Sequence, residues 1–271
     1  MSVLSSIGAQ TINSLTAFGR FWRFCGALFA WMPTTVGRRK DWRLLMPQFY
    51  EIGVKTVPVM STTGIFVGLV LAVQAVEQLR SAGLEEHMGV LVNLSLIREL
   101  GPVLAGVMLA GRVGGALTAE LGTMNITEQI DALKVMGTDP IRYLVVPRFV
   151  ACVLLAPILT LYCDLLGSLG GWFVAVMMSN IPAEPYAYFT ADAIELWDLL
   201  IGLAKSVVFG GAIGLISCYK GFHCKAGAEG VGRACTSAFV TSFIVILVTD
   251  FFLAVLFQDL YEALWGFKPL L

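Results

Sequence analysis

The feature that most constrains this chain is a series of long apolar stretches, each long enough to cross a lipid bilayer. A spanning helix needs about 20 predominantly apolar residues. Five stretches meet this requirement: 57–76, 91–111, 149–178, 196–219 and 236–257. Hydrophobic residues make up 57% of the 271 residues and charged residues only 14%, so one water-soluble core could not bury the apolar surface. We therefore predict an all-α integral membrane protein with five spanning helices.

Residues 11–32 form a different kind of segment. On a helical wheel, Arg20 and Arg23 share one narrow wedge with Thr16. The opposite arc is apolar and holds Leu15, Phe18, Phe21, Trp22, Cys25, Leu28 and Phe29. This pattern is typical of a helix that lies in the membrane interface. The alternatives are a cleaved signal peptide or a sixth span. We divide the chain into an N-terminal cytoplasmic and interfacial segment, 1–46, and a five-span domain, 47–271.

The distribution of basic residues predicts the orientation. Lys and Arg are concentrated before the first span, between the second and third, and between the fourth and fifth. The remaining connections are mostly acidic. Because cytoplasmic loops carry an excess of Lys and Arg, the N-terminus is expected in the cytoplasm. An odd number of spans then places the C-terminus on the other side of the membrane.

Ionisable residues within spans are costly and therefore mark candidate functional positions. Four of them fall in one layer, about 10–14 Å below the outer boundary at 1.5 Å per residue: Arg98, Glu99, Lys205 and Asp250. Lys205 and Asp250 form a plausible pair between neighbouring helices, and Gln74 could join the layer. Asp164 lies deeper, without an obvious partner. The layer is either a structural ion-pair network or the lining of a cavity that admits a charged headgroup.

The connection between the second and third spans carries the signals of a short helix outside the bilayer. Thr127 can cap its start, with Glu128 in the first turn. Gly137 can end it, and Pro140 prevents its continuation. Such a helix is either a docking element or a plain connector.

Several motifs are absent from the sequence. It contains no G-x-x-x-x-G-K-[ST] phosphate-binding loop, so we expect no nucleotide to be bound by this chain. It contains neither H-E-x-x-H nor G-x-S-x-G, and its cysteines fit no zinc pattern. We therefore predict no catalytic residue, no metal site and no bound cofactor, and nothing indicates a nucleic-acid partner.

Several blocks together resemble a known family. The segment D-A-L-x-x-x-G at 131–137 resembles the E-A-A-x-x-x-G loop by which ABC permeases engage their ATPase, with Asp for Glu and Leu for Ala. The longer blocks are L-I-R-E-L-G-P-V at 96–103, A-G-R-V-G-G-A-L-T-A-E-L-G at 110–122, T-E-Q at 127–129, Met136, D-P at 139–140 and K-S-V-V-F at 205–209. Over nearly its whole length, the chain resembles the MlaE (YrbE) family of ABC permeases.

The resemblance implies a homodimeric permease of the bacterial inner membrane, with an interfacial helix and five spans in each copy. It implies a cytoplasmic ABC ATPase that uses ATP, a periplasmic MCE-domain carrier and a small STAS-domain protein as partners. The implied activity is phospholipid transport between the inner membrane and the carrier, which maintains outer-membrane lipid asymmetry. The permease is not itself an enzyme.

The same resemblance implies that a lipid cavity is lined around Arg98 and Glu99. We expect the headgroup to meet Gln74, Arg98, Glu99, Lys205 and Asp250, and the acyl chains to meet Phe66, Leu71 and Leu100. For coupling to the ATPase, the candidates are Glu120, Thr127, Glu128, Asp131, Met136 and Gly137. The alternatives are an ion channel or proton-coupled carrier that uses the charged layer, and a scaffold that transports nothing.

Overall fold

The computed structural model describes residues 3–36 and 42–266, and all regular structure in these ranges is helical. The α-helices are α1 (Val3–Val36), α2 (Trp42–Ile52), α3 (Val57–Ala82), α4 (Met88–Ser95), α5 (Gly101–Leu109), α6 (Gly115–Ile126), α7 (Gln129–Val135), α8 (Val146–Trp172), α9 (Ala183–Ala193), α10 (Leu196–Phe222) and α11 (Ala228–Trp265). Short turns of 3₁₀-helix are η1 (Val54–Thr56) and η2 (Glu85–His87). Turns of π-helix are η3 (Leu96–Leu100), η4 (Ala110–Gly114), η5 (Ile141–Val145) and η6 (Phe173–Met178).

Joined end to end, these pieces make five helices that are long and apolar enough to cross a membrane, as predicted. In the described part of the chain they run over Trp42–Ser81, Glu85–Ile126, Ile141–Met178, Leu196–Phe222 and Ala228–Leu264. Each predicted stretch lies inside one of them. Most of the helices extend beyond the predicted limits because backbone hydrogen bonding continues into more polar flanking residues.

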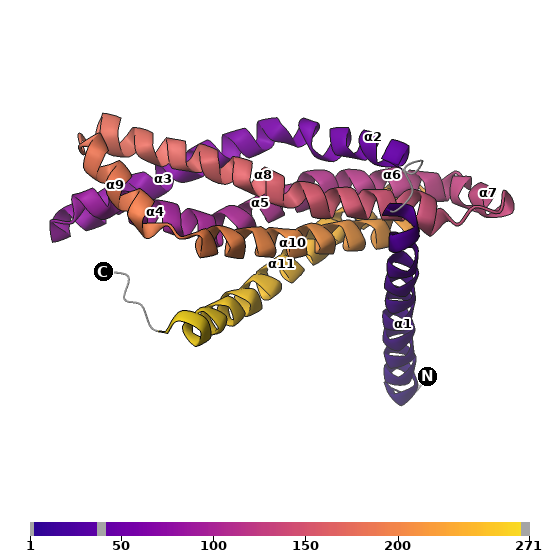
Figure 1. The fold of residues 1–271 in the computed structure, drawn as a ribbon. Coiled ribbons are helices and arrows are strands. Elements are labelled where there is room, and N and C mark those ends of the chain that lie inside the picture. The colour runs from indigo at the N-terminus through magenta and orange to yellow at the C-terminus, as the bar shows by residue number, and fades with distance from the viewer. Residues whose placement is uncertain (1–2, 37–41, 267–271) are drawn as a thin grey trace.

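The spans form an elongated bundle with two distinct ends (Figure 1). We call them the α7 end, which also carries α1 and the start of α2, and the α9 end, where α11 finishes.

Helix α8 packs against both α3 and α10. Close approach depends on glycines at these contacts, because a Cβ on Gly68 would overlap the backbone of Gly167, and one on Gly210 would lie 2.6 Å from the Cys152 carbonyl oxygen. Small residues such as Gly167 and Gly210 therefore allow these helix backbones to approach closely, as is usual between membrane-spanning helices.

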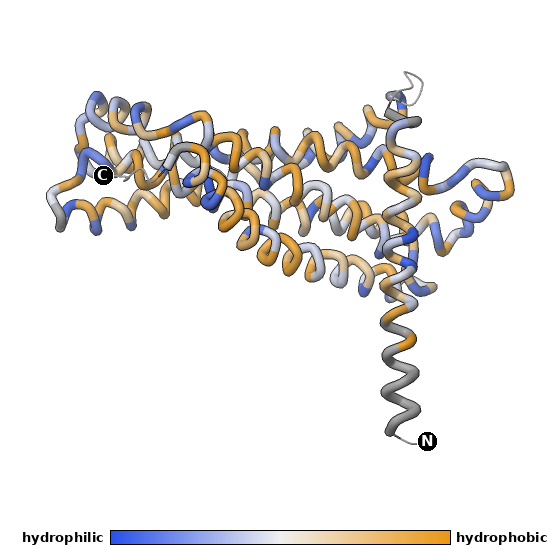
Figure 2. Tube along the Cα trace, turned by 60° about the horizontal axis from the view of Figure 1, so that its bottom comes forward, coloured by the Kyte–Doolittle hydropathy of each residue, from blue (hydrophilic) through white to orange (hydrophobic). Residues whose placement is uncertain are grey.

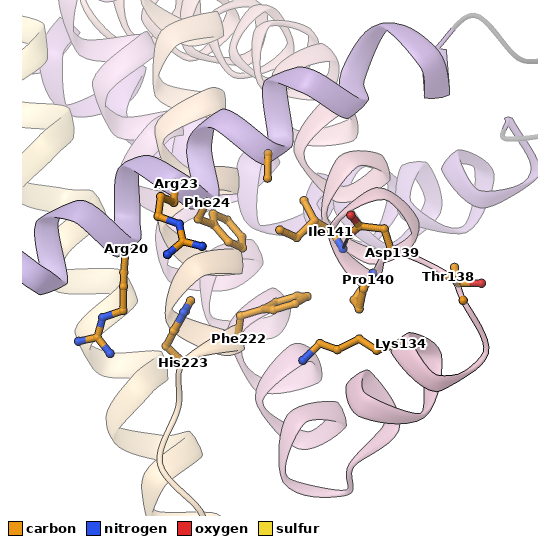
Figure 3. A pocket seen from close by; sticks show the side chains of 12 residues that line it. Arg20, Arg23, Phe24, Lys134, Thr138, Asp139, Pro140, Ile141, Phe222 and His223 are labelled. Atoms are coloured by element: carbon orange, nitrogen blue, oxygen red, sulfur yellow. Dashed lines mark hydrogen bonds between the residues drawn. The ribbon is translucent and has the colours of Figure 1, made fainter.

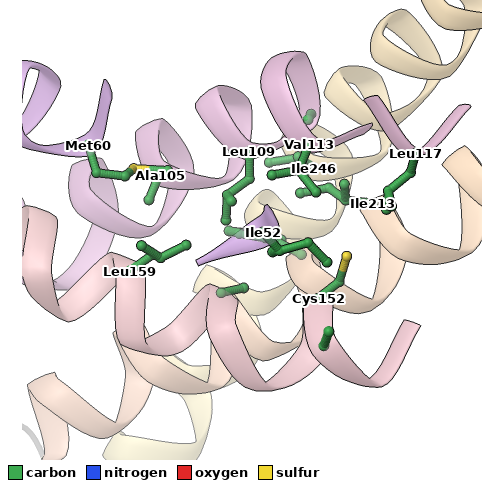
Figure 4. Packing of buried hydrophobic residues seen from close by; sticks show 14 residues of the cluster. Ile52, Met60, Ala105, Leu109, Val113, Leu117, Cys152, Leu159, Ile213 and Ile246 are labelled. Atoms are coloured by element: carbon green, nitrogen blue, oxygen red, sulfur yellow. The ribbon is translucent and has the colours of Figure 1, made fainter. Parts of the chain in front are cut away.

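The main apolar core lies where most of the spanning helices meet (Figure 4). Side chains from seven α-helices contribute to it, including Ile52, Leu109, Cys152, Ile213 and Ile246, all nearly inaccessible to solvent. Outside this core, large apolar side chains of α3 and α11 face outward along the length of the bundle. An apolar exterior around a packed interior is the arrangement expected for a protein surrounded by lipid.

Helix α1 runs across the long axis of the bundle at the α7 end (Figures 1 and 2). Its described part packs through Phe24, Cys25 and Leu28, which are buried against α8, α10 and η5. Phe18 and Trp22 remain exposed. The predicted apolar arc is therefore divided between a protein-facing and an outward-facing part.

The predicted short helix between the second and third spans is present as α7, but its start differs from the prediction. Thr127 does not cap it: its hydroxyl donates to the carbonyl of Thr123 and accepts from the Gln129 side chain. Glu128 is the N-cap residue and has a left-handed backbone, with φ of 59°. The reason is that Thr127 directly follows α6, so its side chain completes that helix. The predicted end is confirmed, because Gly137 has φ of 73° and donates to the Lys134 carbonyl.

Candidate functional site

The predicted layer of charges begins in the π-helical turn η3, which holds Arg98 and Glu99. Pro102 has no N–H and cannot donate to the carbonyl four residues earlier. The preceding Gly101 N–H donates instead to the carbonyl of Leu96, five residues back. This wider turn interrupts the regular α-helix, a geometry that is frequent at functional sites.

Lys205 on α10 is the centre of the layer. Its side chain is fully buried, and its Nζ lies 2.5 Å from Glu99 Oε2 and 3.0 Å from Asp250 Oδ1. The predicted pairing of Lys205 with Asp250 is confirmed, and Glu99 is a second partner that the sequence did not indicate. The three residues come from the second, fourth and fifth spans, so the ion pairs join three helices. Burying this ammonium requires such compensation, since an unpaired charge in a low-dielectric interior is strongly unfavourable.

Arg98 pairs with a different residue, Asp198, a partner that the sequence did not indicate. The Arg98 Nε donates to Asp198 Oδ1 at 2.5 Å, and the Asp198 side chain is buried. Asp198 Oδ2 accepts from the backbone N–H of Glu195, and the two residues form a capping box at the start of α10. The spacing E-x-x-D before an apolar run was a visible signal of this arrangement.

A cleft of about 460 Å³ opens beside this layer at the α9 end. It lies between α4 and η3, the start of α10 and the last turns of α11, and Arg98 and Glu99 line it. Its acidic lining residues are Glu99, Asp192, Glu195, Asp198 and Glu262, and its apolar ones include Val90, Leu94, Ile201, Ala254 and Phe257. Among the described residues, Arg98 is the one cation in the lining. Lys205 lies behind Glu99, out of contact with solvent.

The structure brings four of the eight predicted lipid-contact residues together: Arg98, Glu99, Lys205 and Asp250. Of the eight, Arg98 and Glu99 line the cleft, and the other six do not. Phe66 and Gln74 lie on exposed positions of α3, and Leu71 packs beside the small core at the α9 end. Leu100 is half-buried in η3.

The predicted coupling residues lie at the α7 end and differ in environment. Glu120 is 2.6 Å from the buried guanidinium of Arg148. Asp131 pairs with Lys134 within α7 at 2.7 Å. At the end of α7, Val135 and Met136 are 89% and 70% exposed. Apolar side chains so exposed on a protruding helix indicate a contact surface.

The fold and this cleft define a multi-pass membrane protein with a polar site inside its spanning bundle. Residues 45–256 match the family described as "Permease MlaE", and the chain belongs to this family. It is therefore an ABC transporter permease, a class of membrane subunit that works with an ATPase and is not itself an enzyme.

Relatives from three lineages align with most of the chain. A "Probable ABC transporter permease protein" of Rickettsia felis is 40% identical, over 95% of this chain and 98% of its own. The "Intermembrane phospholipid transport system permease protein MlaE" of Haemophilus influenzae is 34% identical, over 93% and 96%. The "Protein TRIGALACTOSYLDIACYLGLYCEROL 1, chloroplastic" of Arabidopsis thaliana is 38% identical, over 80% of this chain and 62% of its own.

Proposed function

We propose that this chain is the permease subunit of an ATP-driven phospholipid transporter. The observation that carries the proposal is the cleft at the α9 end, where Arg98 and Glu99 meet an apolar lining inside a chain of the MlaE permease family. The name of the Haemophilus relative includes phospholipid transport, which supports the choice of cargo.

The polar lining suits a zwitterionic phospholipid. Arg98 offers a guanidinium to the phosphate, a geometry in which bidentate hydrogen bonds are favourable. Its ion pair with Asp198 holds it in place while leaving the side chain 31% exposed. Glu99, which is 48% exposed, offers a carboxylate to a headgroup amine. Lys205 and Asp250 act through Glu99 by fixing its position.

The wider assembly follows the family resemblance. Two copies of the chain enclose the lipid path in the bacterial inner membrane, with the N-terminus in the cytoplasm and the C-terminus in the periplasm. A separate ATPase subunit binds ATP and presses on α7, and this chain binds no cofactor. A periplasmic MCE-domain carrier exchanges phospholipid at the α9 end, a STAS-domain protein binds the ATPase, and the system maintains outer-membrane lipid asymmetry. Helix α1 lies in the membrane interface.

The test is phospholipid transfer by the complex reconstituted in vesicles. Glu99→Lys reverses the charge that faces the cleft and is expected to reduce the transfer rate at least tenfold, the effect of about 1.4 kcal/mol. The dimer should remain assembled. Glu86→Lys, an exposed charge reversal outside the cleft lining, is the matched control and should leave the rate unchanged.

Two results would contradict the proposal. If the Glu99→Lys complex transferred phospholipid at the unaltered rate, the proposed binding of the headgroup in the cleft would be wrong. Transport of ions or lipids by the purified chain without ATPase or ATP would favour a channel or a proton-coupled carrier instead.

A further inference from the structure

A second cleft, of about 750 Å³, lies at the α7 end and is separate from the proposed transport path (Figure 3). Helix α1 forms one wall, the end of α10 forms another, and α7 with the turn that follows it forms the third. The lining residues are Arg20, Arg23, Phe24, Ala27, Lys134, Gly137, Thr138, Asp139, Pro140, Ile141, Phe222 and His223.

The charge of this cleft is predominantly positive. Arg20 and Arg23 make no ion pair or side-chain hydrogen bond within residues 3–36 and 42–266, and Lys134 adds a third cation, paired with Asp131. Among the described residues, Asp139 is the one carboxylate in the lining, and it is already engaged. Its Oδ2 accepts from the Trp31 indole at 2.9 Å and its Oδ1 from the Ile141 N–H at 2.8 Å. The site therefore fits an anion.

The floor of the cleft is apolar and places it at the edge of the membrane. Figure 3 shows the rings of Phe24 and Phe222 between the basic side chains. Phe222 is the last residue of one spanning helix, and Ile141 is the first residue of another. The cleft is thus at the level where the apolar spans end, which is the level of lipid phosphates. An acidic protein loop would not require this depth or this apolar floor.

We propose that this cleft binds the phosphate headgroup of an anionic phospholipid from the leaflet at the α7 end. Arg20, Arg23 and Lys134 contact the phosphate, and the acyl chains leave along Phe24 and Phe222. Basic pockets beside the ends of spanning helices are known to suit such headgroups. Because Arg20 and Arg23 lie on α1 and Lys134 on α7, a bound lipid joins α1 to the protruding helix and stabilises the position of α7.

The test is lipid titration of the purified full chain, followed by native mass spectrometry. Phosphatidylglycerol is the probe, and phosphatidylcholine and inorganic phosphate are the references. The double variant Arg20→Gln/Arg23→Gln removes two cations from the cleft. At about 1 kcal/mol for each basic residue near a lipid surface, one phosphatidylglycerol binding step should weaken roughly thirtyfold, while phosphatidylcholine binding stays unchanged.

The control is Lys225→Gln/Arg233→Gln, which removes the same charge from exposed positions outside the cleft lining at the same end. It should leave phosphatidylglycerol binding unchanged. Both double variants should unfold at the temperature of the parent chain, since all four side chains are exposed.

Three outcomes would overturn the proposal. Equal weakening in the two double variants would mean that only diffuse surface charge attracts the lipid. Equal affinity for inorganic phosphate would remove the role of the apolar floor. Unchanged lipid binding together with loss of an acidic partner protein in the cleft variant would make the cleft a protein-docking surface. Because the readout is lipid binding at the α7 end, failure here leaves the transport proposal untouched.

Discussion

Gly101 and Pro102 explain how charged residues of an apolar span reach a cleft. Pro102 causes the π-helical turn that carries Arg98 and Glu99. Gly101 permits the close approach of α8, because a Cβ at this position would overlap Asp164 Oδ1. Asp164 is buried, with only 6% of its surface exposed, and this oxygen has no hydrogen-bond partner among the described residues. Asp164, the carboxylate expected deeper in the membrane, is thus packed directly against the turn that carries the candidate site.

Replacement of Gly101 by alanine should therefore destabilise the protein. Overpacking of a tight interior costs about 1–3 kcal/mol, and the added methyl group has no free space. Gly115→Ala is the matched control, because this glycine in the same span has no neighbour within 4 Å of an added Cβ. Thermal unfolding in detergent measures both variants, and equal melting temperatures would contradict the packing argument.

Lys205 offers a second prediction at this scale. Lys205→Met leaves Asp250 as a largely buried, uncompensated carboxylate and should reduce the free energy of unfolding by about 3–5 kcal/mol. The double variant Lys205→Met/Asp250→Leu removes that charge and should recover part of the loss, since Glu99 can be solvated in the cleft. Denaturant titration in detergent measures both. A double variant less stable than the single one would show that the ion pair is not the source of the effect.

At the level of elements, α7 is the one short helix at its end of the bundle that projects beyond the spanning helices (Figure 1), within the described part of the chain. It has acidic residues at its start, a Gly137 stop at its end, and the exposed side chains of Val135 and Met136. Its protrusion and its exposed apolar tip support the proposal that α7 docks on the ATPase subunit.

Charge reversal on α7 should uncouple that contact. The variant Glu128→Lys/Asp131→Lys is expected to reduce co-purification of the ATPase subunit and the ATPase activity of the complex severalfold, because two exposed acidic residues become repulsive to a basic partner surface. Glu229→Lys, a reversal of an exposed charge in the first turn of α11, is the control. Unchanged co-purification and activity in the α7 variant would contradict the docking role.

At the scale of the whole molecule, the cleft exists because α11 packs closely on α10 and α6 but separates from the bundle toward its C-terminal end (Figure 1). Its outward face there is apolar, with Phe251 and Phe252 both 65% exposed. Lipid or a second copy of the chain can cover such a face. The open side of the cleft is therefore a property of helix arrangement and not of any single residue.

The orientation in the membrane can be tested with a cysteine at each end. Val135→Cys on α7 and Tyr188→Cys on α9 both replace exposed side chains. With a membrane-impermeant maleimide applied to spheroplasts, Tyr188→Cys should react at once and Val135→Cys only after lysis, since basic loops remain in the cytoplasm. The parent chain, whose described cysteines are buried or half-buried, supplies the background. The reverse labelling pattern would invert the proposed topology.

Particular residues show how far the sequence could predict the site. Glu99, Lys205 and Asp250 could be placed in one layer because depth in a spanning helix follows from residue count and the fixed rise per residue. Asp198 was missed as the partner of Arg98 because it sits at a helix start, where its acidic character suggested only an exposed connection. The remaining predicted lipid contacts lie on α3 and in η3. No feature of the sequence indicated which neighbouring helix these side chains would face. They are Phe66, Leu71, Gln74 and Leu100.

The sequence by itself determined the five spans, the presence and the end of the short helix between the second and third spans, and the expected bias of charge between the two ends. These features follow from apolar length, a helix-terminating glycine and loop charge, which act locally. Only the tertiary structure decided that Lys205 is shared by Glu99 and Asp250, that Arg98 turns to Asp198, and that two clefts of different charge occupy opposite ends. The physical reason is that burial and ion pairing depend on which helix faces lie against each other. Glycine contacts distant in the sequence determine that packing.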